Sequence, residues 1–122
     1  MMTVSRVVLM LMRLSAVLQV VVGVGMWMGH WGSLLPVHWA NGVLFVLLSW
    51  TIAVIALVQR RAVRRALLAL LWGFVVIAFG FAQQGILPGS LHWIIRVLHL
   101  AVGLAALGIA EGLAPRRRDP LT

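Results

Sequence analysis

Residues 37–65 read VHWANGVLFVLLSWTIAVIALVQRRAVRR, a long apolar run that ends in four closely spaced arginines. The apolar part covers residues 37–58, and a helix needs about 20 such residues to cross the ~30 Å hydrocarbon core of a bilayer. Similar stretches occupy residues 7–29, 66–84 and 91–112. We therefore predict four membrane-spanning helices joined by short connectors.

The composition also favours a membrane protein over a soluble domain. Of the 122 residues, 63% are hydrophobic and 10% are charged, whereas a soluble domain is about half apolar and a quarter charged. Lipid cannot hydrogen-bond a bare backbone, so helices are the expected spanning structure. Short connectors make sequential helices antiparallel. The predicted fold is one all-α domain, residues 1–122, an up-down four-transmembrane-helix bundle with a short basic tail, residues 113–122.

The arginines predict the orientation of this bundle. Nine of the ten lie at one expected end: Arg6, Arg13, Arg60, Arg61, Arg64, Arg65, Arg116, Arg117 and Arg118. The two connectors at the other end carry none, so the positive-inside rule places both termini in the cytoplasm. The positive charge is then a topology signal, and the expected location is a cell inner membrane. Anionic lipid is a candidate contact for the arginines. The charge does not indicate nucleic-acid binding. Four tryptophans near the opposite face fit an interfacial aromatic belt: Trp27, Trp31, Trp39 and Trp93.

Several function classes are excluded by residues that the sequence lacks. There is no cysteine, which excludes disulfides, thiolate-ligated clusters and covalent haem attachment. There is no Gly-rich phosphate loop, nucleophile–base pair or paired carboxylate, so a stand-alone enzyme is disfavoured. Glu111 and Asp119 lie at or beyond the end of the last helix, which leaves no mid-membrane carboxylate for a proton-coupled exporter.

The four histidines lie toward the outer half of the predicted bundle. They are His30, His38, His92 and His99. Ionisable residues within a membrane are costly, and their default interpretation is functional. His38 and His99 share one context, because a glycine follows each four residues later, Gly42 and Gly103. Their helices run parallel and lie diagonally across an up-down bundle, so the two imidazoles can approach one iron from opposite sides.

We therefore predict one b-type haem with His38 and His99 as its axial ligands. Gly42 and Gly103 would let the porphyrin edge approach the backbone, and Arg96 would pair with a propionate. Cross-helix hydrogen bonding without a cofactor is the competing interpretation, since small and polar residues also hold membrane helices together.

The choice of partner for His38 stays open. Counted from Ser33 and Ser90 as candidate helix caps, His38 lies at a depth between those of His92 and His99. His92 is therefore the alternative ligand; otherwise it contacts a propionate or quinone, or is a hydrogen-bonded interfacial residue. A second haem held by His92 and His30 is a further alternative.

The stretches VHWANGVLFVLL and HWIIRVLHLAVG resemble the helices of four-helix membrane b-type cytochromes, and the chain is similar to one half of a haem A synthase. That resemblance implies that the second and fourth helices each supply a histidine to haem. Haem A synthases have an acidic residue before a His-Arg pair, where this chain has Val37 before His38 and Trp39 after it. We expect the protein to transfer electrons between the quinone pool and a partner. Whether it self-associates or belongs to a larger complex stays open. The alternative is a non-catalytic structural or assembly subunit.

Overall fold

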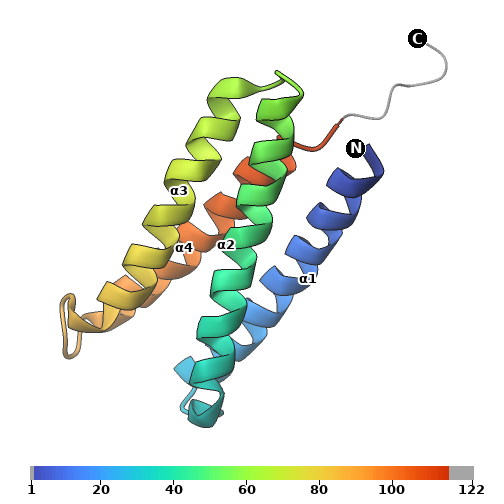
Figure 1. The fold of residues 1–122 in the computed structure, drawn as a ribbon. Coiled ribbons are helices and arrows are strands. Elements are labelled where there is room, and N and C mark those ends of the chain that lie inside the picture. Colours follow the sequence, from blue (N-terminus) through green and yellow to red (C-terminus); the bar gives the residue numbers. More distant parts are fainter. Residues whose placement is uncertain (1, 116–122) are drawn as a thin grey trace, which may run out of the picture.

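Four long helices make up most of this computed structural model, which describes residues 2–115 (Figure 1). They are α1 (Met2–Trp27), α2 (Leu35–Val58), α3 (Val63–Ala82) and α4 (His92–Glu111). Two short 3₁₀ turns, η1 (Gly32–Leu34) and η2 (Gln83–Gly85), adjoin α2 and α3. The described part of the chain contains no strand, and all four helices are long and apolar enough to span a membrane. The all-helical prediction is confirmed.

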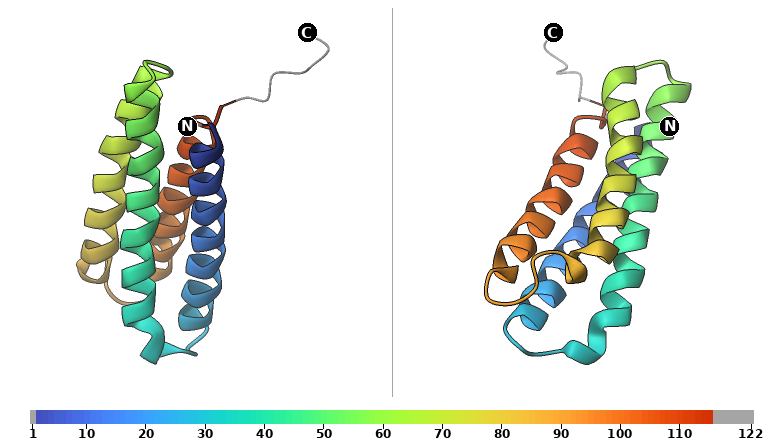
Figure 2. Two further views of the ribbon diagram at one scale, coloured as in Figure 1. Left: turned by 45° about the vertical axis from the view of Figure 1, so that its right-hand side comes forward. Right: turned by 90° about the vertical axis from the view of Figure 1, so that its left-hand side faces the viewer.

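Sequential helices run antiparallel and pack as neighbours, as Figures 1 and 2 show. α1 packs on α2, α2 on α3 and α3 on α4, and α4 closes the bundle against α1. α2 and α4 therefore lie diagonally opposite each other, as predicted. The start of α1, the end of α4 and the connector between α2 and α3 all lie at one end, which we call the arginine end.

The helix boundaries differ from the predicted ones by a few residues. α1 begins at Met2 rather than at residue 7, and α3 begins at Val63 rather than at residue 66. The serine caps are wrong, because Leu34 and Leu91 occupy the N-cap positions without a side-chain hydrogen bond. Pro36 lies in the first turn of α2, where its missing N–H has no helical partner to lose.

The predicted basic tail begins as a turn after α4. Residues 116–122 lie outside the described part of the structure, and so do the tail arginines and Asp119.

The main hydrophobic core lies toward the arginine end. Met12 and Ile52 are fully buried there, surrounded by small residues that let membrane helices approach closely. These are Ala53, Ala56, Ala66, Ala69, Ala106 and Ala110. On α4 the core begins only at Ala106, so the opposite half of the bundle is held by other contacts.

Two tryptophans fix neighbouring helices through backbone acceptors. The indole N–H of Trp50 on α2 donates to the carbonyl oxygen of Leu70 on α3 at 3.1 Å. The indole N–H of Trp72 on α3 donates to the carbonyl oxygen of Val102 on α4 at 3.0 Å. Gly73 permits the first contact, since a β-carbon there would overlap the Trp50 ring. These contacts continue the packing from the core toward the half of the bundle that carries His38 and His99.

Candidate cofactor site

The structure brings His38 and His99 together in the half of the bundle away from the arginine end. His38 lies in the first turn of α2 and His99 in the middle of α4. Their ring centroids are 6.2 Å apart, with an angle of 56° between the ring planes. Both residues are half-buried. Two imidazoles from diagonal helices therefore lie next to each other inside the bundle.

Glycines of the other two helices lie beside these rings. A β-carbon at Gly23 on α1 would lie 3.3 Å from Cε1 of His38. A β-carbon at Gly80 on α3 would lie 3.5 Å from Cε1 of His99. Phe79 stacks on His99, with ring centroids 6.0 Å apart and planes 21° apart. Each of the four helices thus contributes at least one residue to the site.

The Nδ1 atoms of His38 and His99 are buried, and neither has a hydrogen-bond partner among the described residues. Leaving a buried polar atom unsatisfied costs about 1–3 kcal/mol. Buried polar groups are nearly always paired, and an exception needs an explanation. The two imidazoles of the site therefore have a bonding capacity that the protein itself does not use.

A polar network lies next to the site, between α1 and α2. The amide of Asn41 donates to the backbone oxygen of Ser15 at 2.9 Å and to Oε1 of Gln19 at 2.8 Å. The Ser15 hydroxyl donates to Oδ1 of Asn41 at 2.9 Å. Asn41 and Ser15 are buried. This network uses the Ser15 hydroxyl and the N–H groups of the Asn41 amide, and it fixes α1 against the start of α2, one turn from His38.

The glycines of the His-x-x-x-Gly repeat do not flank the rings. A β-carbon at Gly42 would lie 3.0 Å from the side-chain nitrogen of Gln19, so this glycine accommodates the polar network. A β-carbon at Gly103 would have no atom of the described structure within 4 Å. Gly103 therefore borders open space, and its predicted role beside a porphyrin stays a prediction.

The remaining predicted site residues lie farther out. His92, in the first turn of α4, has its Nδ1 3.1 Å from the carbonyl oxygen of Ile86 in the preceding loop. His30 is exposed in the turn after α1, and the Arg96 side chain is exposed. Arg96 precedes His99 by three residues on α4, so helical periodicity places it near the same face; its contact with a propionate stays a prediction.

Sequence reasoning did not identify Asn41 or Phe79 as neighbours of the site. Asn41 follows His38 by three residues, so helical periodicity already placed it on the same face. Phe79 lies beside Gly80 on α3, and nothing in the local pattern of α3 reveals which residue of another helix it meets.

Comparisons with protein-family models, curated proteins and solved structures give no match to this chain.

Proposed function

We propose that this chain is an integral membrane b-type haem protein, with His38 and His99 as axial ligands. It would transfer electrons between the quinone pool and a partner protein. The observation that carries the proposal is the pair of imidazoles on diagonal helices, with ring centroids 6.2 Å apart, whose buried Nδ1 atoms have no partner among residues 2–115.

The spacing of the two rings fits a shared metal. Metal–imidazole bonds are about 2.0–2.1 Å long, and a ring nitrogen lies roughly 1 Å from the ring centre, so two imidazoles that bind one metal would have centroids no more than about 6 Å apart. The centroids of His38 and His99 are 6.2 Å apart. The two imidazoles are therefore close enough together for one metal to bind both.

The donor set supports haem over a bare metal ion. Within residues 2–115 there is no cluster of three or more His, Cys, Asp or Glu side chains. Zinc sites use three or four protein ligands, whereas a haem iron needs only the two axial ones, because the porphyrin supplies the rest. Two imidazoles are therefore a sufficient protein contribution.

The hydrogen bonding argues against pure packing as the role of these histidines. Polar side chains that hold this bundle together make definite cross-helix bonds, as Asn41, Trp50 and Trp72 do. His38 and His99 make none within the described residues. Histidines kept only as cross-helix hydrogen-bonding residues would be expected to use their ring nitrogens in this way.

A bound haem supplies reversible one-electron transfer at its iron. The chain supplies the binding and the environment. Neutral imidazoles from His38 and His99 avoid burying an anionic ligand. Gly23 and Gly80 lie beside the two rings, and Phe79 stacks on His99. The polar network around Asn41 fixes α1 against α2, and thereby holds Gly23 near His38.

The orientation follows from the charge. The arginine end would face the cytoplasm, and His38 and His99 would lie toward the periplasmic face of the inner membrane. Trp27, Trp31, Trp39 and Trp93 are exposed and belong to the end of the bundle opposite the arginines, as an interfacial belt requires. Quinol would then reach the site from within the bilayer.

Absorption spectroscopy of single histidine variants tests this function. The protein, produced with ample haem, should be red, with a Soret band and a sharp α band on reduction. His38→Ala and His99→Ala should each abolish the low-spin spectrum, while His92→Ala and His30→Ala, the matched controls, retain it. If His92→Ala bleaches the protein and His99→Ala does not, the ligand pair is His38 and His92.

A colourless protein that folds and remains colourless with added haem would contradict the proposal. The second candidate function, a structural or assembly subunit of a larger membrane complex, would then account for the chain. The network of Ser15, Gln19 and Asn41 favours that candidate, because it stabilises the bundle without any cofactor.

A further inference from the structure

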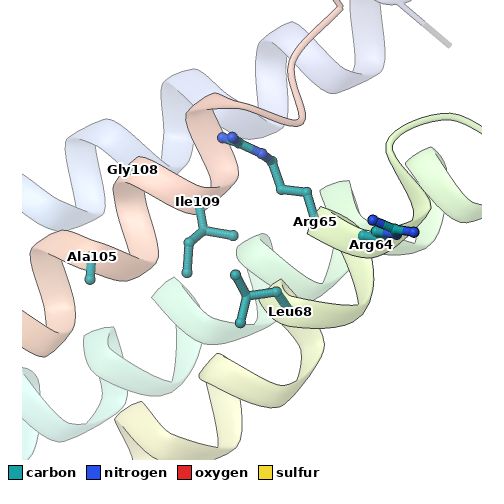
Figure 3. Close-up of a pocket in the computed structure, with 6 residues that line it drawn as sticks. All are labelled: Arg64, Arg65, Leu68, Ala105, Gly108 and Ile109. Atoms are coloured by element: carbon teal, nitrogen blue, oxygen red, sulfur yellow. The ribbon is translucent and has the colours of Figure 1, made fainter.

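A groove separates α3 and α4 near the arginine end, on the surface of the bundle. Its volume is about 380 Å³. Leu68 of α3 and Ile109 of α4 face each other across it, and Ala105 and Gly108 form its small-residue side (Figure 3). Leu68 is exposed. The apolar lining of the groove is therefore open to the medium that surrounds the helices.

Two arginines line the mouth of this groove. Arg64 and Arg65 lie in the first turn of α3 and are exposed. The Arg65 side chain extends toward the end of α4 (Figure 3), where a β-carbon at Gly112 would overlap its guanidinium. Because Gly112 has no side chain, the Arg65 guanidinium can reach from α3 to the end of α4, next to the apolar part of the groove.

The one carboxylate of the described residues does not neutralise this pair. Glu111, on the last turn of α4, accepts two hydrogen bonds from Arg13 on α1, at 2.6 and 2.8 Å. The Glu111 carboxylate is therefore paired with Arg13 and not with Arg64 or Arg65. Two cations at the mouth of an apolar groove are complementary to a ligand with an anionic head and a hydrocarbon chain.

We infer that this groove is a binding site for one anionic phospholipid. The phosphate lies against Arg64 and Arg65, and an acyl chain runs between Leu68 and Ile109 toward Ala105. Basic pockets between helices on the cytoplasmic side of a membrane bind lipid head groups in this way. The site is independent of the proposed haem, because it lies at the opposite end of the bundle.

Native mass spectrometry of the detergent-solubilised protein, titrated with phosphatidylglycerol and with phosphatidylcholine, tests the charge. The expected result is a clear preference of the first-bound lipid for phosphatidylglycerol. The double variant Arg64→Gln/Arg65→Gln should lower that preference by about five-fold per arginine, given the strength of single basic-residue contacts with anionic lipid. The matched control, Arg6→Gln/Arg60→Gln, removes the same charge from the same end and should keep the preference.

A second pair of variants tests the apolar part. Ala105→Trp fills the groove and should weaken phosphatidylglycerol binding without changing the net charge. Ala78→Trp is the control. It adds the same ring at an exposed site on α3 and should not weaken phosphatidylglycerol binding. Gly108→Val replaces Ala105→Trp if that variant fails to give a helical, monodisperse protein.

Three results would overturn the inference. Equal loss of preference in both double arginine variants would mean a diffuse charge effect. Unchanged binding in both groove-filling variants would remove the acyl chain from the groove. Displacement of the lipid by an equal concentration of glycerol phosphate would mean that the arginines bind a phosphate alone.

Discussion

Gly23 of α1 lies against the imidazole of His38, because a β-carbon on this glycine would be 3.3 Å from the ring's Cε1 atom. Gly80 of α3 has the same relation to His99 at 3.5 Å. The helices that carry the two histidines are diagonal, and the helices that carry the two glycines are the other diagonal pair. Each histidine ring therefore packs beside the backbone of a helix that carries neither histidine.

The first prediction concerns these two glycines. Gly23→Ala should reduce haem occupancy, because its methyl group would displace the His38 ring by a few tenths of an ångström. Gly80→Ala should have a smaller effect, since 3.5 Å is an ordinary contact distance. Alanine is about 1 kcal/mol better than glycine within a helix, so the thermal stability of the haem-free protein should not fall in Gly80→Ala.

The ratio of Soret to protein absorbance measures this occupancy. Gly85→Ala is the matched control, because a β-carbon at Gly85 would have no atom within 4 Å. Equal haem content in Gly23→Ala and Gly85→Ala would mean that the backbone of α1 does not orient His38.

The second prediction concerns the Asn41 network. Asn41→Ala leaves the Gln19 carbonyl and the Ser15 hydroxyl with fewer partners, and should destabilise the bundle by about 1–3 kcal/mol. A double-mutant cycle with Ser15→Ala should give a coupling energy of about 0.6 kcal/mol, the average between membrane helices, and at most about 1.7 kcal/mol.

Steric trapping or reversible unfolding in mixed micelles measures both quantities. Thr51→Val is the control, because the Thr51 hydroxyl is exposed and donates only to the backbone oxygen of Leu47 in its own helix, at 2.8 Å. A coupling energy near zero between positions 15 and 41 would contradict a cooperative network.

The sequence predicted the helices well because length and hydrophobicity determine them locally. Four long apolar stretches with short connectors leave few arrangements other than an up-down bundle, and the observed neighbour order agrees with that expectation. Helical periodicity also agrees with the burial on α2, where Phe45, Ser49 and Ile52, spaced four and three residues apart, are all buried.

The site was harder to predict because helical periodicity relates residues within one helix only. The His-x-x-x-Gly repeat favoured His38 and His99, and these rings do lie together. Yet the repeat's own glycines lie elsewhere, and the glycines beside the rings are Gly23 and Gly80. Which residue meets which across the bundle depends on helix tilt and loop geometry, and neither has a local sequence signal.

The third prediction concerns the ion pair between Arg13 and Glu111, whose guanidinium and carboxylate form two hydrogen bonds between α1 and α4. Arg13→Glu and Glu111→Arg should each lower the melting temperature, because each places like charges together. The swapped double variant should recover most of the loss, since it restores opposite charges at the same positions. Melting curves at low and high salt measure this, and additive losses in the double variant would contradict a specific pair.

The fourth prediction concerns topology. The chain has no cysteine, so a single introduced cysteine reports its own side of the membrane without background. Ser33→Cys, between α1 and α2, and Arg60→Cys, between α2 and α3, should react with an impermeant maleimide from opposite sides. In intact cells the cysteine at position 33 should be the accessible one. Labelling of both from the same side would exclude the four-span arrangement.

The last prediction concerns Arg96, which precedes His99 by three residues on α4, about 4.5 Å along the helix axis. Its exposed side chain is long enough to bring a cation near a haem propionate. A nearby cation favours the reduced state, which carries one more negative charge than the oxidised state. Arg96→Leu should therefore lower the reduction potential or loosen the haem, while Arg96→Lys, which keeps the charge, should change the potential less.

Arg64→Leu, at the arginine end, is the control and should leave the potential unchanged. Redox titration followed at the α band measures all three variants. If Arg96→Leu leaves both the potential and the haem content unaltered, Arg96 does not contact the haem but extends to the lipid head groups, as arginines near a membrane surface commonly do.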